Sequence, residues 1–141
     1  MATVKGIPSE LKLYLASSTG KHYEIDASEV YVELEDGVVG VLPGHQPEFY
    51  SISAGFVEWK SVSGEEGKKL LFDGFVQIEP DVVRIGVHEI YEPGEVDVAA
   101  IEAEVKKMEE QLSALTEEEE EARKDLEKKI KAKKLLIEKA R

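Results

Sequence analysis

The chain has 141 residues, of which 42% are hydrophobic, and its formal net charge is −12 at pH 7. This length and hydrophobic content favour one or two small folded domains over a disordered chain, and the acidic balance disfavours binding to nucleic acid or to an anionic membrane surface. The longest apolar runs fall well short of the roughly 18 residues that a membrane-spanning helix needs, and the absence of cysteine excludes disulfides and thiolate metal sites.

The first ten residues, MATVKGIPSE, precede any regular pattern. They lack the apolar segment of a secretory signal peptide. We therefore expect a protein that stays soluble on the side of the membrane where it is made, with residues 1–10 as a flexible extension.

Apolar residues alternate with polar ones, or form short β-rich runs, from Leu11 to about Tyr91. Alternation over short runs is typical of half-buried strands. The residues expected on buried faces are Leu11, Leu13, Leu15, Val30, Val32, Leu34, Val83, Ile85 and Val87. Turn-forming pairs follow these runs at Thr19-Gly20, Asp36-Gly37, Pro43-Gly44, Ser63-Gly64, Asp73-Gly74 and Pro80-Asp81. Because no helical period intervenes, residues 1–94 are predicted to form an antiparallel β-sandwich or barrel.

One of these turns lies in an unusual stretch, GVLPGHQPEF, which covers residues 40–49. Pro43 suits the second position of a type II turn, and Gly44 suits the third position, where the φ angle is positive. His45 follows the turn, and Pro47 stiffens the segment after it. This loop is therefore predicted to present a fixed shape.

The apolar period changes to that of a helix after Pro93-Gly94. A first stripe contains Val98, Ile101, Val105, Met108, Leu112 and Leu115, and Asp97 stands at its N-cap position. A second, weaker stripe contains Ala122, Leu126, Ile130, Ile137 and Ala140 and is interrupted by Lys133. Thr116 and Glu119 before it have the spacing of a capping box. Residues 95–141 are therefore predicted to form a two-helix hairpin.

The second predicted helix is unusually rich in cations for an acidic chain. They are Arg123, Lys124, Lys128, Lys129, Lys131, Lys133, Lys134, Lys139 and Arg141. One interpretation is that they match the helix dipole and form i,i+4 pairs, such as Glu127 with Lys131, each worth a few tenths of a kcal/mol. The other is that they meet an acidic partner. The dipole acts only within the last turn, so the cations that occur earlier favour a partner.

The sequence contains no recognisable catalytic or metal-binding pattern. His22, His45 and His88 fall in separate segments without the spacing of metal ligands. The stretch GEEGKK at residues 64–69 has too few residues between its glycines for a phosphate loop, and no Ser or Thr follows its lysines. We therefore predict no catalytic residue, no metal and no cofactor.

The order of these features resembles the epsilon subunit of bacterial and chloroplast F-type ATP synthases. The resemblance covers nearly the whole chain: the segments LKLYLASSTGKHYE, SEVYVELEDG and GVLPGHQP, the GFV strands at residues 55 and 74, and Val96-Asp97 before the hairpin. GVLPGHQP, at its distance from the N-terminus and before a helical hairpin, is the most specific of these segments.

The resemblance implies a non-catalytic subunit of the central stalk that binds the gamma subunit, rests on the c-ring and inhibits ATP hydrolysis through its hairpin. It implies a peripheral position on the cytoplasmic face of the inner or plasma membrane, within the complex. The residues that would face the c-ring are Glu35, Asp36, Pro43, Gly44, His45 and Pro47. Those that would contact an acidic segment of the beta subunit are Arg123, Lys128, Lys131, Lys133 and Lys134.

Some members of this family bind ATP at the hairpin through Ile or Leu, Asp, two variable residues, Arg and Ala. Asp97 keeps the aspartate of this pattern, whereas Ala100 stands where the arginine would be. Asp97 is thus the one candidate nucleotide contact.

A second interpretation belongs to a different class of protein. The chain could be a free-standing sandwich that binds carbohydrate or peptide and dimerises through a coiled coil, because each predicted helix carries a regular apolar stripe. Co-purification with a gamma subunit would separate this interpretation from the first.

Overall fold

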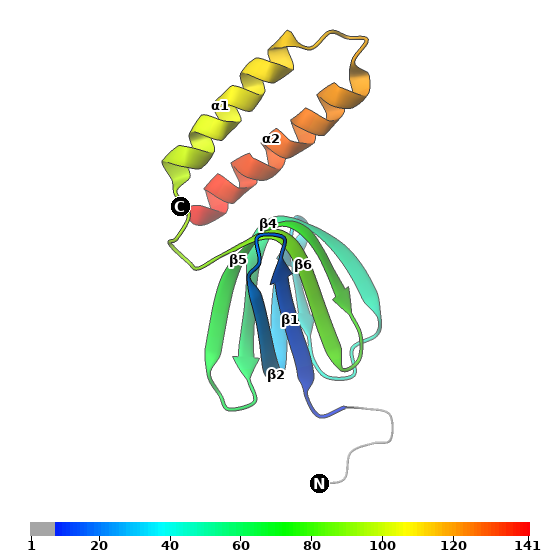
Figure 1. The fold of residues 1–141 in the computed structure, drawn as a ribbon. Helices are drawn as coiled ribbons and strands as arrows, with labels where there is room; N and C mark the ends of the chain where they lie inside the picture. Colours follow the sequence, from blue (N-terminus) through cyan, green and yellow to red (C-terminus); the bar gives the residue numbers. More distant parts are fainter. Residues whose placement is uncertain (1–7) are drawn as a thin grey trace.

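A computed structural model describes residues 8–141, which form a β-sheet structure followed by a helical hairpin (Figure 1). The first seven residues of the predicted extension lie outside this described part. The strands are β1 (Leu11–Ser17), β2 (His22–Leu34), β3 (Gly37–Val41), β4 (Glu48–Ser61), β5 (Glu66–Ile78) and β6 (Val82–Tyr91). They form one sheet in the order β1-β6-β5-β4-β2-β3, and an additional pairing of β1 with β2 closes it. The predicted all-β sandwich followed by a helical hairpin is confirmed.

One strand pair departs from the predicted antiparallel arrangement. β1 and β6 run parallel, from Lys12 opposite Val82 to Ser17 opposite Val87, whereas the other strand pairs are antiparallel. Turn signals fix the direction only of strands joined by a hairpin. β1 and β6 are separated by four other strands, so their relative direction follows from closure of the sheet.

The predicted turn at Asp73-Gly74 is wrong, because β5 continues through it. Asp73 has a φ of 58° and Gly74 pairs with Ile52 on one side and with Val87 on the other. A Cβ atom at Gly74 would lie 2.0 Å from the Gly86 carbonyl oxygen. Glycine is needed here for the close approach of β5 and β6, and not for a turn. Close approach of another backbone is a common reason for glycine inside a strand.

The centre of the sandwich is filled by the residues that alternation predicted. Fully or almost fully buried side chains include Leu11, Leu13, Leu15, Val30, Val32, Val83, Ile85 and Val87. Leu34, at the end of β2, is only half-buried and packs against this core. Because this core contains strand residues alone, it does not depend on the hairpin.

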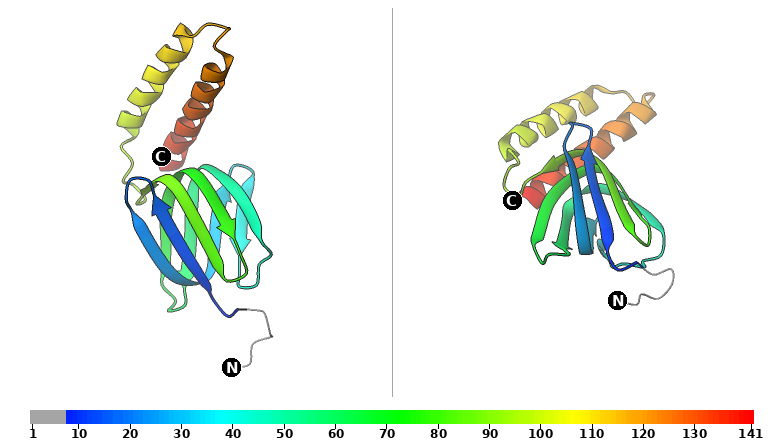
Figure 2. Two further views of the ribbon diagram at one scale, coloured as in Figure 1. Left: turned by 45° about the vertical axis from the view of Figure 1, so that its right-hand side comes forward. Right: turned by 60° about the horizontal axis from the view of Figure 1, so that its bottom comes forward.

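The hairpin consists of α1 (Val98–Ala114) and α2 (Glu120–Ala140). Its tip points away from the sandwich, and the C-terminal end of α2 lies beside the sandwich (Figures 1 and 2). Neither helix is long and apolar enough to span a membrane, in the part of the chain that the structure describes.

Asp97 is the N-cap of α1, as predicted, and its side chain accepts a hydrogen bond from the Ala100 N–H. The predicted capping box forms only in part. The Glu119 carboxylate accepts from the Thr116 N–H at 3.4 Å, which is one half of the box, and also from the Thr116 hydroxyl at 3.1 Å. The Glu119 N–H instead donates to the Thr116 carbonyl in a turn. As a result, Glu119 becomes the N-cap and α2 begins at Glu120.

Candidate functional site

The residues predicted to face the c-ring occur in two groups, one before and one after β3. Glu35 and Asp36 precede the strand, and Pro43, Gly44, His45 and Pro47 follow it. The strand's five residues span roughly 17 Å at about 3.3 Å each. The Glu35 carboxylate lies 3.1 Å from Lys131 Nζ of α2, on the side of the hairpin. The Gly44 N–H instead donates to the carbonyl of Pro80, in the turn between β5 and β6. The two groups therefore lie at opposite ends of β3 and do not form one surface.

The loop after β3 has the predicted turn. Gly44 has a φ of 88°, and the His45 N–H donates to the Leu42 carbonyl at 3.1 Å. The His45 ring is held in turn, because Nδ1 lies 2.7 Å from the Gln46 carbonyl oxygen and Nε2 lies 3.6 Å from Glu48. These contacts give the loop a defined shape.

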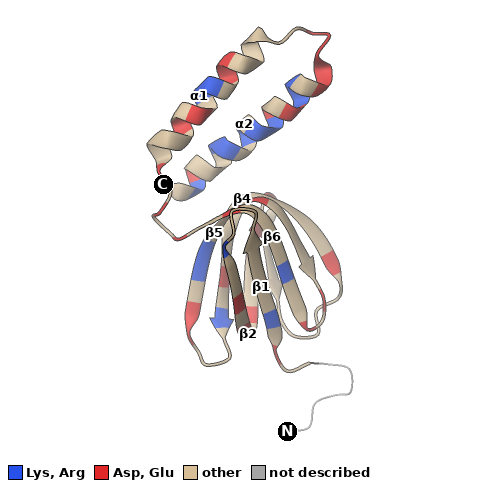
Figure 3. Cartoon of the chain, in the orientation of Figure 1, with Lys and Arg blue, Asp and Glu red and all other residues tan. Residues whose placement is uncertain are grey.

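Four of the five basic residues predicted to bind the beta subunit have partners within the chain. Arg123 Nη1 donates to the Leu115 carbonyl at 3.1 Å. Nζ–carboxylate distances are 3.1 Å for Lys131 and Glu35, 2.5 Å for Lys133 and Glu104, and 3.4 Å for Lys134 and Glu109. The three lysines thus pair with carboxylates of α1 and of the sandwich, and Figure 3 shows Lys and Arg segments along α2 and Asp and Glu segments along α1. In this state α2 has acidic partners of its own chain.

A groove of about 650 Å³ lies between the sandwich and the hairpin. Its lining includes Glu35 and Ser53 of the sandwich, Glu109 and Leu112 of α1, and Lys128, Lys131 and Lys134 of α2. A residue predicted to face the c-ring therefore lies beside residues predicted to bind beta. Sequence spacing could not show this, because about a hundred residues separate the two segments.

A second apolar core holds the hairpin on the sandwich. Ala54 of β4 and Leu70 and Phe72 of β5 pack with Ile101, Val105, Ile130, Leu136 and Ile137 of the helices. Leu136 is fully buried, although the sequence analysis did not single it out. Lys133, which interrupts the predicted stripe, lies with Nζ 5.4 Å from the centre of the Phe72 ring. A lysine at the margin of an apolar face can cover it with its aliphatic stem.

One ion pair at this interface is shielded from solvent. Lys139 Nζ lies 2.8 Å from Glu33 Oε2, and each side chain is 27% exposed. The Phe56 N–H donates to the other Glu33 oxygen at 3.0 Å. Burial raises the pKa of the Glu33 carboxyl, but the bonds from Lys139 and Phe56 outweigh burial, so the pKa lies below its ordinary value. The sequence analysis missed Glu33, whose outward position between Val32 and Leu34 was the available signal.

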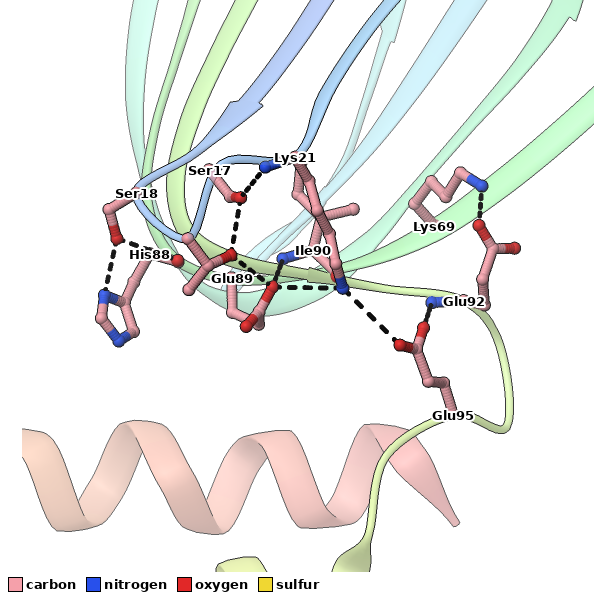
Figure 4. A network of polar contacts seen from close by, with 10 residues as sticks. Ser17, Ser18, Lys21, Lys69, His88, Glu89, Ile90, Glu92 and Glu95 are labelled. Carbon is pink, nitrogen blue, oxygen red and sulfur yellow. Dashed lines mark hydrogen bonds and ion pairs between the residues drawn. The ribbon is translucent and has the colours of Figure 1, made fainter.

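The linker between β6 and α1 is held by a second group of polar contacts, the linker clamp (Figure 4). Lys21 Nζ lies 3.3 Å from Glu89 and 3.6 Å from Glu95. The Glu92 N–H donates to the Glu95 carboxylate at 2.6 Å, and Lys69 pairs with Glu92. Two lysines of the sandwich thus fix two glutamates of the linker.

Two groups of the clamp have shifted pKa values. Burial raises the pKa of Glu89, but hydrogen bonds from Thr19, the Ile90 N–H and Lys21 lower it by more. Burial lowers the pKa of Lys21, but the bond and charge of Glu89, together with Glu95, raise it by more. Both shifts favour the charged forms in the folded state.

These shifts predict how the clamp's stabilisation depends on pH. It should be present in full between about pH 5 and pH 10, decrease as pH falls through the lowered pKa of Glu89, and decrease as pH rises through the raised pKa of Lys21. Urea unfolding should show Glu89→Gln to be less stable than the wild type by about 1 kcal/mol at neutral pH, with the difference shrinking as pH falls through the lowered pKa of Glu89. Glu118→Gln, at the exposed hairpin tip, serves as the control. A difference that persists unchanged at low pH would contradict the prediction.

Asp97, the candidate nucleotide contact, uses one carboxylate oxygen to cap α1 at 3.1 Å from the Ala100 nitrogen. Within residues 8–141, no group of three or more His, Asp or Glu side chains is arranged to hold a metal ion.

The sandwich also exposes an aromatic pair that the sequence analysis missed. Phe49 and Phe75 are stacked with ring centroids 5.5 Å apart, and they are 63% and 44% exposed. Both lie at outward positions of paired strands. Adjacent large apolar side chains on a surface commonly mark a protein contact.

Comparison with known proteins identifies the family to which the sandwich is similar. The family described as "ATP synthase, Delta/Epsilon chain, beta-sandwich domain" matches residues 10–93. An ATP synthase epsilon chain of Anoxybacillus flavithermus is 30% identical over 104 residues, which are 74% of this chain and 77% of that one. The ATP synthase epsilon chain of Alkalihalophilus pseudofirmus is 29% identical over 106 residues, 75% of this chain and 79% of the relative.

Among solved structures, a chain of the mitochondrial ATP synthase of Euglena gracilis superposes with a TM-score of 0.63 at 17% identity, covering 95% of this chain and 86% of that one. A chain from the central stalk and c-ring of the Tetrahymena thermophila mitochondrial ATP synthase gives a TM-score of 0.52, also at 17% identity, covering 62% of this chain and 69% of that one. At this identity the superpositions show a shared fold.

Proposed function

Because the chain belongs to the ATP synthase delta/epsilon family, we propose that it is a non-catalytic rotor subunit whose helical hairpin inhibits ATP hydrolysis. Its curated relatives are epsilon chains, and a chain of the same fold is found in the central stalk and c-ring structure of a mitochondrial ATP synthase.

The sandwich would join the other rotor subunits through two of its surfaces. The stacked pair Phe49 and Phe75 suits an apolar patch of the gamma subunit. The stiff loop from Pro43 to Pro47 would face the c-ring, at the end of β3 remote from Glu35. This orientation would make the chain a peripheral component on the cytoplasmic side of the membrane, and it leaves Glu35 and Asp36 on the hairpin side.

The observation that carries the inhibitory role is the pairing of α2 cations with carboxylates of the same chain. Lys131, Lys133 and Lys134 each have one such partner, and the side chains of Lys131 and Lys134 are more than half exposed. Exposed ion pairs contribute little net free energy, about 0–1 kcal/mol each. An acidic segment of the beta subunit could therefore replace them when the hairpin extends.

The test is to replace Lys128, Lys131, Lys133 and Lys134 together with glutamine in the assembled ATP synthase. We expect faster ATP hydrolysis at low salt, because several charge pairs in a partly dehydrated cavity are worth more than exposed ones. Higher ionic strength should partly reproduce the effect in the wild type, with screening over about 8 Å at physiological salt.

A matched control replaces Lys124 and Lys129 with glutamine. These two lysines pair with Glu120 and Asp125 within α2 itself. This variant should hydrolyse ATP at the wild-type rate. If the quadruple variant also keeps the wild-type rate at every salt concentration, the hairpin does not inhibit through these lysines.

The alternative, a free-standing binding sandwich with a dimerising coiled coil, needs an apolar helix stripe that faces outward. Ile101, Val105 and Ile130 instead pack in one core with Leu70 and Phe72 of the sandwich. Both stripes are used within the chain, so the structure favours the rotor subunit.

A further inference from the structure

The docked hairpin is held at its two ends by contacts of different kinds. We propose that Glu33 and Lys139 form a latch that holds the C-terminal end of α2 on the sandwich, and that the hairpin swings about the segment between Glu95 and Asp97 when the latch opens. This inference concerns the chain by itself and does not depend on the proposed inhibition.

The latch differs from the other ion pair between helix and sandwich in its burial. Glu33 and Lys139 are each 27% exposed, whereas Lys131 and Glu35 are 78% and 54% exposed. Solvent and salt screen the exposed pair, so it adds little to docking. Removing one charge of the shielded pair leaves its partner half-buried without a counter-charge for as long as the hairpin stays docked.

The sandwich fixes the position of Glu33 independently of the hairpin. Pairing of β2 with β4 ends at Val32 and Val57, and the next N–H on β4, that of Phe56, donates to the Glu33 side chain. Gly55 leaves room for this arrangement, because a Cβ atom there would lie 2.4 Å from the Glu33 carbonyl oxygen. The carboxylate is therefore held ready to receive Lys139.

The linker clamp determines where the hairpin swings. Glu92 is held by Lys69, and Glu95 is held by Lys21. A turn bond from the Glu95 N–H to the Glu92 carbonyl ties the two together. Asp97 caps α1 and moves with it. The backbone between the last clamped residue and the cap is thus the place where a change of angle disturbs the fewest contacts.

The absence of cysteine allows a direct measurement of docking. Cysteines placed at Glu65, in the β4–β5 turn, and at Glu118, at the hairpin tip, can carry two spin labels, since both positions are exposed. Pulsed electron paramagnetic resonance on the isolated full-length chain then gives the distribution of distances between the label on the sandwich and the label at the hairpin tip. The variants are E33Q, K139Q and the double variant, and the matched control is E35Q with K131Q at the exposed pair.

We expect E33Q to raise the ratio of undocked to docked chains about tenfold, the value for loss of one charge-assisted contact, and we expect the control pair to change it less than about threefold. K139Q should raise this ratio as much as E33Q does. The double variant should have nearly the same ratio as either single variant, because the two changes remove the same interaction. Equal effects of E33Q and the control, or additive effects of E33Q and K139Q, would overturn the latch.

Hydrogen exchange at two linker amides tests the position of the swing. The amides of Glu92 and Glu95 are both donors within the linker. Their protection should be the same in E33Q as in the wild type, since the clamp stays closed. Loss of protection that accompanies undocking would place the swing inside the clamp and overturn that part of the inference.

Discussion

Replacing Gly74 with alanine should lower the free energy of unfolding by about 3 kcal/mol, the upper part of the range for overpacking a tight site. The added Cβ atom would lie 2.0 Å from the Gly86 carbonyl oxygen and 2.6 Å from the Val87 Cα atom. These are backbone atoms of β6, so the overlap can be relieved only by moving one strand away from the other. Urea unfolding of the purified chain measures the loss.

The control for this prediction is Gly40→Ala. A Cβ atom at Gly40 would meet the Tyr31 ring at 3.1 Å, and this side chain is 39% exposed and can turn aside. We expect a loss of less than about 1 kcal/mol for Gly40→Ala. Equal losses for the two variants would show that the spacing of β5 and β6 is not tight.

Ending the chain after Pro93 should abolish inhibition of ATP hydrolysis in the assembled enzyme while leaving the sandwich folded and bound to its rotor partner. The effect should exceed that of the quadruple lysine variant, because the whole hairpin is removed. The sandwich should fold because its core contains strand residues alone. It would expose Leu70 and Phe72, which the helices cover in the intact chain, so its melting temperature should fall by a few degrees.

The measurements are the rate of ATP hydrolysis and co-purification of the shortened chain with the gamma subunit. A second version that ends after Leu115 retains α1 and removes α2 alone. It should relieve inhibition as fully, since the cations proposed to bind the beta subunit lie on α2. A shortened enzyme that binds gamma and hydrolyses ATP at the intact rate would leave the subunit a coupling role only.

Local patterns predicted the parts of the fold that depend on local physics. The alternation of Leu11, Leu13 and Leu15 identified a buried strand face, and the cap at Asp97 identified the start of α1. The type II turn at Pro43-Gly44 follows from the two residues themselves. Each of these features depends on residues close together in the chain.

The missed features depend on contacts across the chain. Leu136 was overlooked because the predicted stripe resumed after Lys133 at Ile137, whereas in the fold Leu136 and Ile137 are both buried and Lys133 lies over Phe72. Glu33 stands 106 residues from Lys139, and no spacing rule links such positions. For the same reason the sequence grouped Glu35 with the Pro43 loop, although β3 carries them to opposite ends.

The parallel contact between β1 and β6 also constrains how the chain is made. β1 emerges from the ribosome first among the strands and can pair with β2 at once, since a short turn joins them. Its second edge stays unpaired until Val82–Tyr91 has been synthesised, and an open strand edge is a site at which newly made chains aggregate. Only then can the sheet close. The hairpin, translated after the six strands, forms from local contacts and docks on a sandwich whose strands have all been made.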